Sequence, residues 1–162
     1  MDKVKHKEFF LQYVGRYINI CCKIEHSCHL FLIEHYVEHN DRTNQFIRDF
    51  LSRKSMGFYA AMKNVMNVLS DDPEYSSSFK KELHNSKSVN RIVKNRDIFA
   101  HSHLNGFKEE SFKLLWFNSD HEKNNYAIRY SYEQLEEELT FIKDFSNSIT
   151  DIVRPILENR YK

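Results

Sequence analysis

Residues 89–103, read V-N-R-I-V-K-N-R-D-I-F-A-H-S-H, combine groups that could bind an anion and transfer a proton. Arg96 carries a permanent positive charge, whereas His101 and His103 can gain or lose a proton near neutral pH. If the stretch is helical, Asp97 and His101 lie one turn apart, so the carboxylate could orient the imidazole. A cation beside a proton-transfer group is what cleavage of a phosphodiester requires. The stretch therefore predicts a site for phosphodiester chemistry.

A helix is the element that must position these groups. Val89, Ile92 and Val93 are spaced as i, i+3 and i+4, which predicts a helix with one apolar face and Ser88 as its cap. Residues 79–108 hold seven Lys or Arg against two acidic residues, which indicates a local anion site. Three further polar residues, expected on the other face of this helix, could help to bind phosphates: Arg91, Lys94 and Asn95.

The segment R-D-I-F-A-H, from Arg96 to His101, resembles the R-x4-6-H motif of the HEPN superfamily, and Arg96 with His103 fits the longer spacing of that motif. HEPN domains are all-helical, and many are metal-independent ribonucleases of toxin, phage-defence and RNA-processing systems. The resemblance implies that Arg96 stabilises the phosphate and that His101 is the acid or base. Asp97 would hold the His101 ring, and His103 is a second catalytic candidate.

One position departs from a part of this family. HEPN toxins that are paired with a nucleotidyltransferase antitoxin often carry Tyr two residues after the motif His, where this chain has His103. This departure argues against an antitoxin that modifies such a tyrosine. An antitoxin or regulatory protein of another kind remains an expected partner.

Cleavage of RNA without a metal requires a base for the 2′-hydroxyl and an acid for the leaving 5′-oxygen, on opposite sides of the phosphorus. Either His101 and His103 of one chain share this work, or two chains each present Arg96 and His101. HEPN ribonucleases take the second route, so the resemblance implies a homodimer with the site between the chains. The expected products are a 2′,3′-cyclic phosphate and a 5′-hydroxyl.

Composition agrees with a helical domain. The 162 residues suit a single domain, residues 1–162, and the chain holds only three Gly and two Pro. The net charge of +1 does not by itself indicate a nucleic-acid partner. Three cysteines do not indicate a disulfide framework, the charged first residues lack the apolar run expected of a signal peptide, and no apolar run approaches the length of a membrane span, about 20 residues. We therefore expect a cytoplasmic protein with no membrane partner.

Apolar periodicity predicts an all-α, up-and-down bundle of about five helices. A long helix is expected near residues 5–39, where apolar residues alternate in steps of four and three along one face. Another is expected near residues 131–161, where Ser131 and Gln134 form a capping box and Pro155 should kink or end the helix. A short helix is expected near 44–51, and a further helix, capped by Ser55, should end at Asp71–Pro73. Asn105-Gly106 should break the chain, and residues 107–130 should form a small hairpin or irregular insert.

Two alternatives compete with the nuclease interpretation. A non-catalytic HEPN-like helical module could use the same surface to bind RNA, nucleotide or a protein partner. A structural bundle could instead hold a metal through Cys22, His26 and His29 of the first helix, but no paired Glu-x-x-His or Cys-x-x-Cys spacing supports such a site. We expect neither a metal nor another cofactor.

Overall fold

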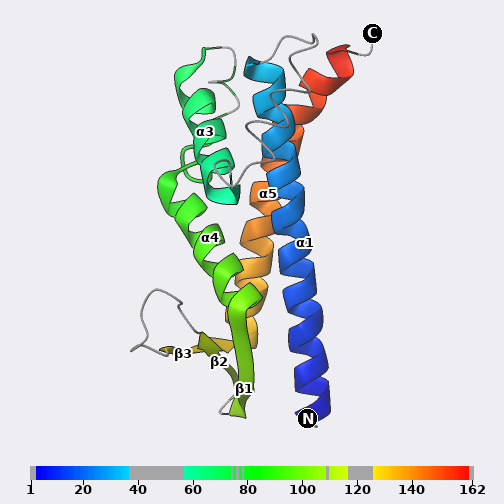
Figure 1. Cartoon of the computed structure of the whole chain (residues 1–162), viewed down its shortest axis with the longest axis vertical. Helices are drawn as coiled ribbons and strands as arrows, with labels where there is room; N and C mark the ends of the chain where they lie inside the picture. Colours follow the sequence, from blue (N-terminus) through cyan, green and yellow to red (C-terminus); the bar gives the residue numbers. More distant parts are fainter. Residues whose placement is uncertain are drawn as a thin grey trace.

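The computed structural model describes residues 3–36, 57–73, 75, 77, 79–108, 110–116 and 126–160. Within these residues the chain is mostly helical and carries one small antiparallel sheet (Figure 1). The expected short helix near residues 44–51 lies outside the described residues. The elements follow in the order α1 (Lys3–Tyr36), α3 (Phe58–Asp71), α4 (Ser86–His101), β1 (Ser102–Lys108), β2 (Ser111–Trp116), β3 (Tyr126–Ser131) and α5 (Tyr132–Arg160).

The two longest helices, α1 and α5, lie side by side and run in the same direction (Figure 1). Their first turns meet: His6 Nδ1 is 2.6 Å from the hydroxyl of Tyr132, and the rings of Phe9 and Tyr132 are 4.7 Å apart. The helical character is confirmed, but the chain is not a pure bundle of helices, because it also carries the small sheet. Among the described helices, none is both long and apolar enough to span a membrane.

The apolar face of α1 was predicted from its steps of three and four residues, and the structure confirms it. Tyr17, Ile24, Cys28 and Phe31 are completely buried. Around Phe99 of α4, aromatic rings from α1 pack edge to face, with centroid distances of 5.2 Å to Tyr13 and 4.9 Å to Tyr17. This contact between α1 and α4 fixes the helix that carries the candidate site.

The sheet has β2 in the centre, with β1 and β3 antiparallel on either side. Phe112 and Leu114 of β2 are completely buried, so one face of the sheet packs on the helices. The expected chain break at Asn105-Gly106 is wrong, because β1 runs through these residues with a bulge. At the bulge Gly106 has φ +150°, a conformation that a residue with a Cβ rarely adopts.

The ends of the helices show which capping signals were correct. The Ser131–Gln134 capping box forms: the N–H of Gln134 donates to Ser131 Oγ at 3.1 Å, and the N–H of Ser131 donates to Gln134 Oε1 at 2.9 Å. α3 ends at Asp71 as predicted, but its N-cap is Gly57, so the assignment of Ser55 is wrong. α5 does not end at Pro155 but continues to Arg160.

A buried histidine joins the segment before α4 to α5. His84 has no exposed surface. Its Nδ1 accepts the N–H of Lys80 at 3.1 Å, so its Nε2 carries the proton and donates to Ser148 Oγ at 2.9 Å. Burial, with the nearby charge of Lys80, lowers the pKa of His84 to about 4.

This histidine should make stability depend on pH. In the unfolded chain a histidine takes up a proton near pH 6.5, whereas folded His84 stays neutral down to about pH 4. Its contribution is therefore complete above pH ~6.5 and is lost as the pH falls towards 4, by up to about 3 kcal/mol. Urea unfolding at several pH values in this window should show the loss. In His84→Gln the loss should be smaller, and an unchanged pH dependence in that variant would contradict the assignment.

Candidate functional site

The predicted helix over the motif is α4, and it begins two residues earlier than Ser88. Its N-cap is Asn85, whose side-chain oxygen accepts the N–H of Ser88 at 3.0 Å, so the assignment of Ser88 as the cap is wrong. Val89 and Ile92 are buried as expected. The helix ends at His101, and β1 begins at the next residue.

One face of α4 presents three of the candidate residues to the surface. Lys94 and His101 are exposed, and Asp97 is half-buried. Residues three, four and seven apart lie on the same side of a helix, so these side chains form a row from Lys94 through Asp97 to His101. His101 ends this row at the C-terminus of the helix.

Arg96 lies next to this row and contacts its middle residue, Asp97. Its Nη1 lies 3.1 Å from Asp97 Oδ1, and the two side chains are 40% and 42% exposed. The guanidinium also lies over the ring of Phe58, 5.8 Å from its centroid. In the described part of the chain, Asp97 therefore pairs with Arg96 and makes no hydrogen bond to His101, contrary to the expected carboxylate–imidazole contact.

Arg96 and His101 do not share a face of the helix. Residues five apart are separated by about 7.5 Å along the axis and about 140° around it. The second candidate imidazole, His103, is exposed on β1, two residues beyond the last residue of α4. One chain thus brings together Arg96 and Asp97, and it places His101 and His103 on either side of the junction between helix and strand.

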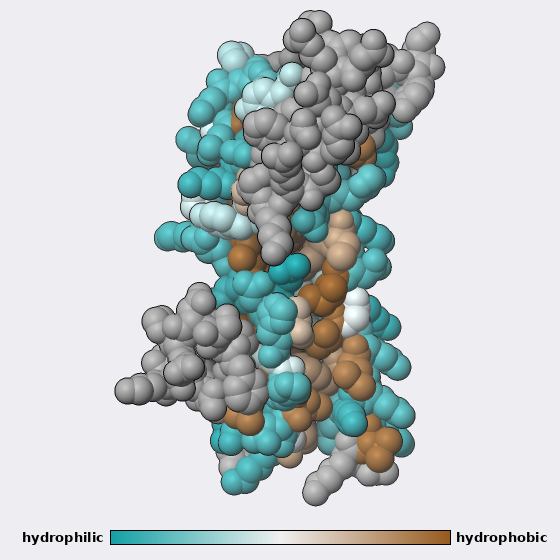
Figure 2. All heavy atoms as spheres, viewed as in Figure 1, coloured by the Kyte–Doolittle hydropathy of each residue, from teal (hydrophilic) through white to brown (hydrophobic). Residues whose placement is uncertain are grey.

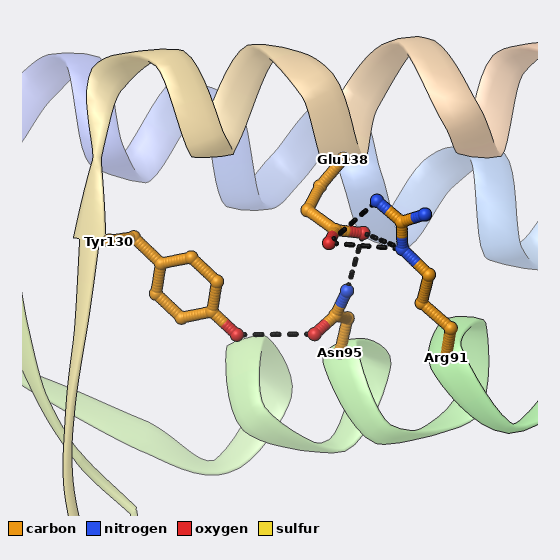
Figure 3. Close-up of polar contacts among 4 residues, drawn as sticks. All are labelled: Arg91, Asn95, Tyr130 and Glu138. Atoms are coloured by element: carbon orange, nitrogen blue, oxygen red, sulfur yellow. Dashed lines mark hydrogen bonds and ion pairs between the residues drawn. The ribbon is translucent and has the colours of Figure 1, made fainter.

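Two residues predicted to bind RNA turn instead towards α5 (Figure 3). Arg91 donates from Nε to both carboxylate oxygens of Glu138, at 3.1 and 3.0 Å, and its Nη2 lies 3.0 Å from Oε1. Asn95 is only 6% exposed, so its expected position on the polar face is wrong. Its amide donates to Glu138 Oε2 at 2.6 Å, and its oxygen accepts the hydroxyl of Tyr130 at 3.1 Å.

This Glu138 network ties three elements together. It joins α4 to α5 through Glu138 and to β3 through Tyr130, so it holds the motif helix against its neighbours (Figure 3). Burial, together with the charge of Glu138, raises the pKa of Tyr130 to about 12. Burial likewise raises the pKa of Tyr13 and Tyr17 on α1. All three hydroxyls therefore keep their protons at neutral pH.

The residues proposed for the alternative metal site do not form a cluster. Cys22 is exposed on α1, and no three His, Cys, Asp or Glu side chains among the described residues lie close enough to hold a metal ion. Cys21 and Cys28 are buried, and none of the three cysteines forms a disulfide. Burial raises the pKa of the Cys21 thiol to about 12, although the charge of Arg96 opposes this shift.

The candidate site therefore consists of an exposed row on α4 with Arg96 beside it, held in place by the partly buried Glu138 network, which no local motif indicates. Comparison of the chain with protein-family models, with curated proteins and with solved structures gives no match.

Proposed function

We propose that this protein is a metal-independent endoribonuclease of HEPN type that acts as a homodimer in toxin or phage-defence systems of the cytoplasm. The observation that carries the proposal is the position of Arg96 and His101 on the last two turns of α4, both reachable from solvent. A guanidinium that is 40% exposed can bind a phosphate from solution. An exposed imidazole at a helix C-terminus can exchange protons with a bound substrate.

In this mechanism Arg96 stabilises the negative charge on the phosphoryl oxygens, and His101 moves the proton. Asp97 orients the guanidinium through the 3.1 Å contact, rather than the imidazole as first expected. The other imidazole comes from a second chain or from His103, because the base and the acid act on opposite sides of the phosphorus. The products are a 2′,3′-cyclic phosphate and a 5′-hydroxyl.

An apolar surface supports the dimer. Apolar side chains follow α1 along the face of the molecule in Figure 2. Val4 is 59% exposed and Leu11 is 57% exposed. With the half-buried Ile18 they repeat every seven residues, so they lie on one side of the helix. A second copy of the chain that covers this side would remove exposed apolar surface and bring two copies of α4 to one assembly.

The test is cleavage of RNA by the purified protein in an excess of a metal chelator. We expect new RNA ends that carry a 2′,3′-cyclic phosphate, together with a dimer in sedimentation. Cleavage that depends on added metal, or 3′-hydroxyl ends, would contradict the proposed chemistry.

A second candidate function is a non-catalytic module that binds RNA, nucleotide or a protein partner through the same face of α4. The geometry of α4 favours it, because Arg96 and His101 are separated by about 140° around the helix axis and so do not meet at one phosphate within a single chain. This module would bind RNA with a steep dependence on salt and yield no new ends.

A further inference from the structure

A cavity of about 590 Å³ lies where the first turns of α1 meet β1 and β2. Its apolar wall is formed by Leu104 and Phe107, and the ring of Phe107 stacks on His6 at 3.7 Å between centroids. Its remaining polar lining is mostly cationic: the side chains of Lys7, Lys108 and Lys113. The volume falls in the range of small-molecule sites, which combine an apolar wall with a few polar groups.

A neighbouring cavity has charged residues of the opposite sign. It has a volume of about 480 Å³ and shares His6 and Phe107 with the first cavity. Its charged lining residues, however, are Glu110 and Glu133 rather than lysines. An anion would therefore be attracted to the first cavity and repelled from the second.

The strand register explains why the lysines gather at the first cavity. Lys113 of β2 pairs with Gly106 of β1, and Phe112 pairs with Phe107. Because Phe112 is buried, its neighbour Lys113 points to the opposite, outer face of the sheet, and Lys108 lies on that face as well. Gly106 has no side chain, so it leaves the space beside Lys113 open.

The same outer face connects the cavity to the candidate site. His103 pairs with Leu115 on this face, and Arg129 of β3 pairs with Lys113. The cationic residues of the face thus continue from the end of α4 to the cavity. At about 3.3 Å per residue, the path along β1 from His103 to Lys108 is roughly 17 Å. A single-stranded chain of a few nucleotides could span this path.

We propose that this lysine-lined cavity binds a nucleotide of a single-stranded RNA whose scissile phosphate lies at His101. Because β1 is an edge strand, the cavity reaches both faces of the sheet: the lysines hold a phosphate of that nucleotide, and Leu104 and Phe107 on the inner face contact its base. Lysine side chains are flexible and act as point charges, so they bind the phosphates of the RNA backbone and do not distinguish one base sequence from another. The assignment of RNA rests on the proposed function, whereas the anion site rests on the lining residues.

The experiment measures binding of a fluorescein-labelled oligouridine in the His101→Ala background, where cleavage is not expected. The test variant adds Lys7→Gln, Lys108→Gln and Lys113→Gln, and the control adds Lys143→Gln, an exposed lysine on α5. We expect the Kd of the triple variant to rise by about 10- to 100-fold and the slope of log K against log salt to fall by about 2. The control should match the His101→Ala parent.

An unchanged Kd and slope in the triple variant would overturn the inference, even if the wild type cleaves RNA. Conversely, lysine-dependent binding by a protein that never cleaves RNA would support the inference and contradict the proposed nuclease. Equally tight, lysine-dependent binding of a poly-glutamate peptide would overturn the assignment of RNA as the ligand.

Discussion

His101→Ala should reduce the rate of RNA cleavage by about 100- to 10,000-fold, because positioned acid–base groups contribute effects of this size. His101 is exposed at the end of α4, so its removal should leave the fold intact. The measurement is single-turnover cleavage of a labelled RNA in chelator. Arg96→Ala should reduce the same rate by about 100- to 1,000-fold, since it removes charge stabilisation at the phosphate.

The matched control is His26→Ala, which removes an exposed histidine from α1 rather than from the motif helix. Its cleavage rate should equal that of the wild type, and circular dichroism should show the same helix content for all variants. If His101→Ala and Arg96→Ala both cleave as fast as His26→Ala, these residues are not catalytic and the nuclease proposal fails.

Glu138→Ala should destabilise the fold by about 2–4 kcal/mol, as expected when one partner of a partly buried charged network is removed. The variant leaves the buried amide of Asn95 without its acceptor at 2.6 Å and Arg91 without its counter-ion. The Arg91 side chain is 44% exposed and can regain water, which places the cost below that of a fully buried pair. Urea unfolding measures the change in the free energy of unfolding.

Glu137→Ala provides the control, because Glu137 is the neighbouring exposed carboxylate on α5. Its effect should stay within about 0.5 kcal/mol of zero, as is usual for surface substitutions. Equal effects of the two substitutions would mean that the contacts of Glu138 do not stabilise the junction of α4, α5 and β3.

Much of the helical framework could be predicted from local patterns. The steps of three and four in α1 and the capping box at Ser131 depend on neighbours within one or two turns, and both are confirmed. The contact between the first turns of α1 and α5 could not be predicted, because His6 and Tyr132 are far apart in sequence. The strand β1 was missed because Asn105-Gly106 indicates a turn and instead forms a bulge.

The candidate site was predictable only in part. The spacing predicted that Asp97 and His101 lie one turn apart, and in the structure they share one side of α4. The spacing could not show that Asp97 pairs with Arg96 rather than with His101, since the sequence places both side chains near the carboxylate. The sequence did contain an indication that Asn95 is buried, because Asn95 follows the apolar Ile92 by three residues and so lies on the same side of the helix. Its partner Glu138 lies in another helix, where no local pattern marks it.

The peptide bond between His101 and Ser102 joins α4 to β1 without a connecting loop. Ser102 already has extended dihedral angles, φ −91° and ψ 148°, while its N–H still donates to the carbonyl of Ile98. No loop residue at this point could absorb a movement of the helix relative to the strand. A residue inserted there would have to be accommodated at the junction itself, because the pairing of β1 with the buried β2 fixes the face of the sheet on which His103 lies. For the same reason, a ligand that changes the orientation of the sheet would also rotate the last turn of α4 and the imidazole of His101.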